Sequence, residues 1–201
     1  MGCRCSLGHW RCCWGGSMSP DQSLIIWINQ GWASPFLDWL LSWVSDKYSF
    51  SFPLLLLLLW TAVSRELSAG LRWWLALILM VALGDALGAQ LKDLFAQARP
   101  CFSFFEPLRL IEGGQCGASL KGMPSNHALN SFAATAFLFV TRPAWKGWRL
   151  FLLVSAILVA LSRIYLAKHF PSQVVMGAAI GTLWGLAAAC LYDRIRCRGS
   201  D

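Results

Sequence analysis

Two histidines stand in short polar and basic clusters at the edges of apolar stretches. His127 ends the run Pro124-Ser125-Asn126-His127, and His169 ends the run Ser162-Arg163-x5-His169. A third cluster, Lys92-x6-Arg99-Pro100, supplies two further cations. Histidine can transfer protons or act as a nucleophile near neutral pH, and fixed cations stabilise the charge on phosphoryl oxygens during transfer. Together the clusters predict a phosphate-handling site. No metal-type set of carboxylates accompanies them, so a mechanism without a metal ion or other cofactor is favoured.

The elements that position these clusters belong to a membrane protein. The chain has 201 residues, of which 57% are hydrophobic and only 13% are charged, a composition unlike that of soluble domains. A net charge of +7 could indicate nucleic acid, but the cations alternate with apolar runs instead of forming one stripe. We therefore expect a bilayer with anionic headgroups as the partner, and no nucleic acid. The twelve tryptophans fit an interfacial aromatic belt.

The apolar runs predict an all-α membrane helix bundle with five spanning helices, six being the alternative count. The expected spans are 48–63, 73–96, 125–140, 148–165 and 172–191, which are 16 to 24 residues long against the roughly 20 that a bilayer requires. Residues 23–45 contain two apolar blocks interrupted by polar groups and Pro35. We interpret these blocks as two short interfacial helices; one broken spanning helix is the alternative.

The distribution of Lys and Arg between the connections predicts the orientation. The side with more cations, taken as cytoplasmic, carries Arg65, Arg72, Arg142, Lys146, Arg149, Arg194, Arg196 and Arg198. The outer side carries Lys92, Arg99, Arg109, Lys121, Arg163 and Lys168. Both span-associated histidines fall on the outer side, where binding an anion would explain the cations. The expected location is a bacterial inner membrane, with the site facing the periplasm or exterior.

The three clusters, in their order and with the intervening spans, resemble the three signatures of the type 2 phosphatidic acid phosphatase / vanadium haloperoxidase superfamily, in its membrane lipid phosphatase branch. The resemblance covers roughly residues 50–192. It implies that His169 is the nucleophile that forms a phosphohistidine and that His127 protonates the leaving group. It also implies a phosphate-binding set made of Lys92, Arg99, Ser125, Asn126 through a nearby backbone N–H, and Arg163.

One position departs from the family pattern. The third signature commonly continues His-x3-Asp, and here that place is occupied by Gln173. A glutamine carbonyl can still accept a hydrogen bond from the imidazole, but it adds no compensating charge. The chain is therefore either weakened or, as in the similar glucose-6-phosphatase and dolichyl-diphosphatase branches, active with glutamine. We favour an active enzyme and expect Gln173→Asp to retain or raise turnover.

The resemblance implies hydrolysis of a membrane lipid with a phosphate or diphosphate headgroup. Candidates are undecaprenyl diphosphate, phosphatidate, phosphatidylglycerophosphate and lipid A phosphate. Two alternatives stay open: transfer of the phosphate to another lipid, and a lipid-binding protein without catalysis. The sequence does not set the oligomeric state.

Three further features have two readings each. Asp85 either supports Lys92 or makes a structural hydrogen bond to a neighbouring helix, and Arg109 either contacts the headgroup or belongs to an ordinary solvated loop. Cys101 and Cys116 flank one outer loop and either pair in a disulfide or stay reduced.

The first 17 residues differ in composition from the rest of the chain. They are expected to be an added leader before a natural start at Met18, although Met1-Gly2-Cys3 also fits an N-myristoylation pattern. Residues 18–201 are expected to form a single membrane phosphatase domain.

Overall fold

The structure, a computed structural model, describes residues 18–46, 49, 67–103, 108–111, 120–142 and 146–198. Regular secondary structure in these residues is helical, which confirms the all-α prediction for the described part of the chain. The helices are α1 (Pro20–Gly31), α2 (Pro35–Ser45), α4 (Leu67–Phe95), α5 (Pro100–Ser103), α6 (Asn126–Thr141), α7 (Lys146–Tyr165) and α8 (Pro171–Arg198). The leader at 1–17 and nearly all of the span expected at 48–63 lie outside the described residues.

Three segments of the described chain are long and apolar enough to cross a membrane: Gly70–Phe102, Gly147–Tyr165 and Pro171–Arg198. They correspond to three of the five expected spans. The helix expected at 125–140 is α6, which has 16 residues and is therefore short of the roughly 20 that a bilayer takes. Large apolar side chains such as Leu75 on α4 and Leu150 on α7 are exposed, as on helices that face lipid.

Helix α6 packs against α4, α7 and α8. Its contact with α8 is unusually close because Gly177, Gly181 and Gly185 follow one face of α8 at four-residue spacing. A Cβ atom added at Gly181 would lie 2.1 Å from the carbonyl oxygen of Leu129, and one added at Gly185 would lie 2.2 Å from that of Ala133. The two backbones therefore touch directly, and this contact fixes the start of α6 beside the start of α8.

The segment 23–45 forms two helices, as expected; their position at a membrane interface stays a prediction. Ser19 and Ser34 are the N-cap residues, and each is followed by a proline in the first helical turn. Ile25 and Leu41 are buried in a core that they share with Ile164 at the end of α7. This core holds α1 and α2 against the end of α7.

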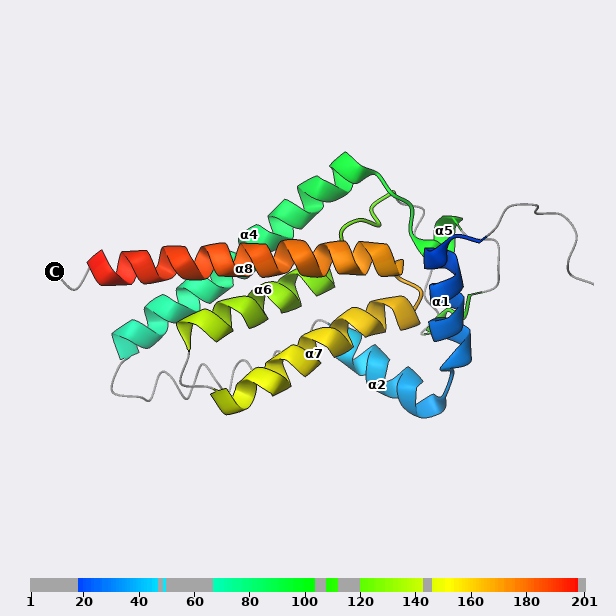
Figure 1. Ribbon diagram of the computed structural model, residues 1–201, viewed down its shortest axis with the longest axis horizontal. Helices are drawn as coiled ribbons and strands as arrows, with labels where there is room; N and C mark the ends of the chain where they lie inside the picture. Colours follow the sequence, from blue (N-terminus) through cyan, green and yellow to red (C-terminus); the bar gives the residue numbers. More distant parts are fainter. Residues whose placement is uncertain are drawn as a thin grey trace, which may run out of the picture.

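The helices alternate in direction so that all three clusters come to one end of the bundle. Helices α4 and α7 run toward that end, and α6 and α8 begin there; α1 packs against α7 and α8 at this end (Figure 1). Lys92 is in the last turn of α4 and Arg163 is in the last turn of α7. The sequence stretches that carry the predicted chemistry therefore share one end, as the proposed single site requires.

Candidate active site

The third cluster is shaped by the way α7 ends. The backbone N–H groups of Lys168 and His169 both donate to the carbonyl oxygen of Arg163, over 3.0 and 3.1 Å. Ala167 has a φ of 53°, the left-handed conformation that usually recruits glycine just after a helix. This turn fixes the cation Arg163 and the histidine relative to each other through backbone bonds.

The ring of His169 is almost fully buried, with 3% of its surface exposed. Its Nδ1 atom lies 2.7 Å from the carbonyl oxygen of Gly122 and 3.3 Å from Oε1 of Gln173. Because a carbonyl oxygen can only accept, Nδ1 carries the proton and Nε2 holds a lone pair. Burial, with the charges of Arg163 and Arg99, lowers the pKa of His169 to about 3 from its ordinary 6.5. The imidazole is therefore neutral at pH 7.

Gln173 connects His169 to the first cluster. Its Nε2 atom donates to the carbonyl oxygen of Ala98 over 2.9 Å, and its Oε1 atom accepts from the backbone N–H of Phe170. The expected bond from the imidazole to Gln173 is present, but at 3.3 Å it is longer than the bond to Gly122. The sequence does not indicate this role of Gly122, because a backbone carbonyl has no side-chain signature.

The first cluster also contains a left-handed alanine. The N–H of Ala96 closes α4 on the carbonyl oxygen of Lys92 over 3.0 Å, and its φ of 44° turns the chain toward Arg99. The charges of Lys92 and Arg99, like that of Arg163, act on the ring of His169. Lys92 and Arg163 also act on His127. Cations from two clusters thus lie close enough to influence both histidines.

The second cluster is tied to α8 and α4. The backbone N–H of Ser125 donates to the carbonyl oxygen of Gln173 over 3.1 Å. The Ser125 hydroxyl is buried and finds no hydrogen-bond partner among the residues that the structure describes. An orphaned hydroxyl at this position is suited to a phosphoryl oxygen, because a buried polar group without a partner is costly.

Asp85 makes structural hydrogen bonds to the neighbouring helix, one of its two expected roles. Its Oδ1 atom accepts from Nδ2 of Asn126 over 2.9 Å and from Nδ2 of Asn130 over 3.0 Å. The side chain of Asn126 is therefore engaged with α4, and a phosphate contact through its backbone stays a prediction. The charge of Asp85 also acts on Lys92, so both of its predicted roles have support.

Helix α2 adds a residue that none of the three clusters contains. The hydroxyl of Ser45 accepts a hydrogen bond from Nη1 of Arg163, and the backbone of Ser45 interacts with the ring of His127. Ser45 is 118 positions from Arg163 in the sequence, so no local pattern could have indicated this contact. It brings the end of α2 into the site.

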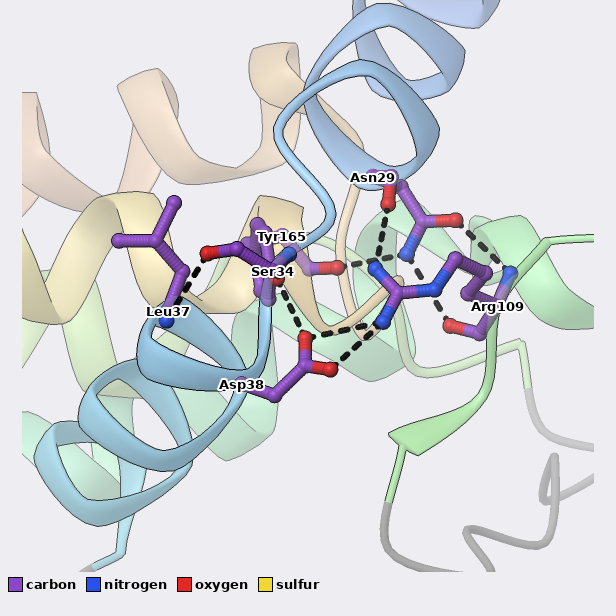
Figure 2. Close-up of polar contacts among 6 residues, drawn as sticks. All are labelled: Asn29, Ser34, Leu37, Asp38, Arg109 and Tyr165. Atoms are coloured by element: carbon purple, nitrogen blue, oxygen red, sulfur yellow. Dashed lines mark hydrogen bonds and ion pairs between the residues drawn. The ribbon is translucent and has the colours of Figure 1, made fainter.

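A polar cluster holds α1 and α2 in this position (Figure 2). Arg109 binds the Asp38 carboxylate with one nitrogen at 2.7 and 3.0 Å from its two oxygens, and Asp38 also accepts from the Tyr165 hydroxyl. Asn29 donates to the carbonyl oxygens of Arg109 and Tyr165, over 3.0 and 2.6 Å. Arg109 is therefore a structural residue that locks both helices to the end of α7, and the solvated-loop reading is wrong for it.

The predicted disulfide is described at one of its two cysteines. Cys101 is disulfide-bonded, and Cys116 lies outside the described residues, so the pairing of these two cysteines stays a prediction.

Comparison with known proteins gives consistent matches. The family model of the PAP2 superfamily matches residues 73–197. The chain is 30% identical to lipid A 4'-phosphatase of Bacteroides thetaiotaomicron, over 82% of this chain and 73% of that protein. It is 33% identical to an undecaprenyl-diphosphatase of Sulfolobus acidocaldarius, over 54% of this chain and half of that protein.

Two solved structures have a similar fold. LpxE of Aquifex aeolicus superimposes with a TM-score of 0.66 at 25% identity, covering 85% of this chain and 95% of that one. A PAP2 type phosphatidylglycerolphosphate phosphatase of Bacillus subtilis superimposes with a TM-score of 0.61 at 22% identity, covering 87% of both chains.

Proposed function

This chain belongs to the PAP2 superfamily, and on that premise we propose that it is an integral-membrane lipid phosphatase. It hydrolyses a lipid phosphate or diphosphate through a phosphohistidine intermediate. The observation that carries the proposal is the hydrogen bond from Nδ1 of His169 to Gly122, which leaves the Nε2 lone pair available. A buried neutral imidazole among fixed cations is equipped to attack phosphorus.

In the first step, Nε2 of His169 attacks the phosphorus atom, and the bond from phosphorus to the leaving oxygen breaks. The negative charge of the bound phosphate stabilises the protonated form of His127. His127 gives its proton to the leaving oxygen, so the lipid product leaves neutral at this atom. In the second step, water attacks the phosphohistidine and His127 accepts the proton from water. The phosphorus–nitrogen bond then breaks, which releases inorganic phosphate and restores both histidines.

The remaining residues of the clusters bind the phosphoryl oxygens. Lys92, Arg99 and Arg163 stabilise the charge that spreads over these oxygens as the bonds change. The Ser125 hydroxyl, buried and without a partner among the described residues, donates one further hydrogen bond. Ser45 and Gln173 hold Arg163 and the loop of the first cluster in place.

The candidate substrates are lipid A phosphate, phosphatidylglycerophosphate, phosphatidate and undecaprenyl diphosphate. The names of the relatives, lipid A 4'-phosphatase and undecaprenyl-diphosphatase, support this range. The proposed location is a bacterial inner membrane with the site facing the periplasm or exterior, supported by the excess of cations in the connections at the other side.

The test is phosphate release by the purified full chain in detergent from these four lipids. We expect release from at least one lipid, inhibition by vanadate, and no loss of rate with a chelator. His169→Ala should abolish release, and His127→Ala should reduce it by a factor of about 10² to 10⁴. Equal release by the wild type and His169→Ala, or a strict magnesium requirement, would contradict the proposal.

A further inference from the structure

A cavity of about 350 Å³ lies between the last turn of α2 and the end of α7. It is lined by Ser42, Trp43, Ser45, Asp46, Arg163, Leu166 and Lys168. Two of these residues connect it directly with the proposed chemistry. Arg163 belongs to the phosphate-binding cations, and Lys168 is the chain neighbour of His169. The cavity is therefore adjacent to the proposed phosphate-binding residues.

Ser45 connects the cavity with His127. Ser45 lines the cavity, and the backbone of Ser45 interacts with the ring of His127, the residue proposed to protonate the leaving oxygen. By contrast, the Nδ1 side of His169 faces Gly122 and Gln173, which do not line this cavity. Atoms attached to the leaving oxygen would therefore enter the cavity next to Ser45.

The lining mixes hydrogen-bond donors and acceptors around an aromatic ring. The Ser42 hydroxyl is buried and has no hydrogen-bond partner in the described part of the chain. Lys168 contributes an ammonium group and Asp46 a carboxylate, so their formal charges cancel. The third charged residue of the lining, Arg163, donates to the Ser45 hydroxyl and belongs to the proposed phosphate-binding set. Trp43 is about half exposed. Such a lining suits a neutral group with several hydroxyls, whereas a second phosphate would meet the Asp46 carboxylate.

We propose that this cavity binds the hydroxyl-bearing headgroup that carries the leaving oxygen, a sugar or a glycerol. The inference rests on the proposed phosphatase function and narrows its substrate class. It predicts a preference for monoesters of a sugar or glycerol headgroup over lipid diphosphates, and over phosphatidate, whose leaving alcohol has no free hydroxyl. Ser42 and Lys168 then determine specificity by binding hydroxyl groups of the substrate.

The experiment compares kcat/KM of the full chain in detergent for four lipids: a lipid A-type sugar monophosphate, phosphatidylglycerophosphate, phosphatidate and a polyprenyl diphosphate. The variants are Ser42→Ala and Lys168→Gln, with Ser155→Ala on the part of α7 away from the site as the matched control. We expect the kcat/KM for the better hydroxylated substrate, divided by the kcat/KM for phosphatidate, to fall about fivefold in Ser42→Ala. This is the loss typical of one neutral hydrogen bond. In Lys168→Gln it should fall about tenfold, because a charged donor is lost.

The outcomes separate this inference from the function on which it rests. If the wild type releases phosphate from none of the four lipids, the proposed function fails. If it releases phosphate but the ratios in both variants equal those of Ser155→Ala, the cavity proposal alone is overturned. A selective loss of diphosphate turnover in Lys168→Gln would also overturn it, since the cavity would then bind a second phosphate. Because Lys168 is partly exposed, its variant still tests the proposal if Ser42→Ala does not fold.

Discussion

The Nδ1 atom of His169 donates its hydrogen bond to the backbone carbonyl of Gly122, 2.7 Å away. The carbonyl sets the tautomer and the orientation of the ring without adding a charge. The sequence predicts this role for Gln173, four residues after His169. Gly122 in turn donates from its N–H to the carbonyl oxygen of Gln97 over 2.7 Å. The proposed nucleophile is thus oriented by the chain segment that precedes the His127 cluster.

Gly122→Ala should damage both stability and turnover. A Cβ atom at this position would lie 2.6 Å from Nε2 of Gln173 and 2.7 Å from the carbonyl oxygen of Ala98. We expect a loss of about 1–3 kcal/mol in the free energy of unfolding, as for other overpacked sites, and at least a tenfold lower kcat. Thermal unfolding and phosphate release measure the two effects. Wild-type stability and turnover in this variant would contradict the close packing of Gly122 against Gln173 and Ala98.

Gln173→Asp should retain or raise turnover but lower stability. A carboxylate can accept from Nδ1 of His169 and adds a charge that favours the imidazolium-like phosphohistidine. It cannot donate to the carbonyl oxygen of Ala98, a bond that Gln173 makes over 2.9 Å. The expected cost is about 1 kcal/mol in the free energy of unfolding, or more where the carbonyl is left buried without a partner. A large fall in kcat with unchanged stability would contradict this account.

The sequence predicted the parts of the site that side chains form. It did not predict the parts that the backbone forms. The three clusters and the all-helical fold followed from residue types and apolar periodicity, and the clusters lie at one end of the bundle (Figure 1). The left-handed Ala96 and Ala167 could not be predicted, because glycine is the residue that usually marks such turns. Ser45 meets Arg163 only through the tertiary packing of α2. The local sequence around either residue does not indicate this contact.

The stability of the protein should fall as the pH drops below about 6.5. His169 has a pKa of about 3 when folded, against its ordinary value of 6.5. Between these values the unfolded chain binds a proton that the folded chain does not, so stability is fully present above pH 6.5 and decreases toward pH 3, by up to about 1.4 kcal/mol per unit. Thermal unfolding in detergent from pH 7.5 to 4.5 measures the slope, which should be smaller in His169→Asn. Equal slopes would contradict the prediction.

Arg109→Lys should loosen α1 and α2 from the site. Lysine keeps the charge but loses the planar group that binds Asp38 and the carbonyl oxygen of Asn29 (Figure 2). Because the two charged side chains are about one third exposed, we expect a loss of only about 1 kcal/mol in the free energy of unfolding, with a several-fold lower kcat/KM. The matched control is Lys121→Ala, whose ion pair with Asp93 is mostly exposed and should contribute little. Equal effects of both variants would refute a special role for Arg109.

Gly181→Ala should be among the most destabilising single-methyl additions in the bundle, because the new Cβ atom would lie 2.1 Å from the carbonyl oxygen of Leu129. Neither backbone can give way without moving α6 relative to α8, so we expect a loss of about 1–3 kcal/mol or more and lower turnover through displacement of His127. The control is Gly147→Ala in α7, where a Cβ atom meets nothing within 4 Å. That change should be neutral or stabilise the helix by up to about 1 kcal/mol. Similar melting temperatures for the two variants would mean that α6 and α8 are not packed backbone to backbone.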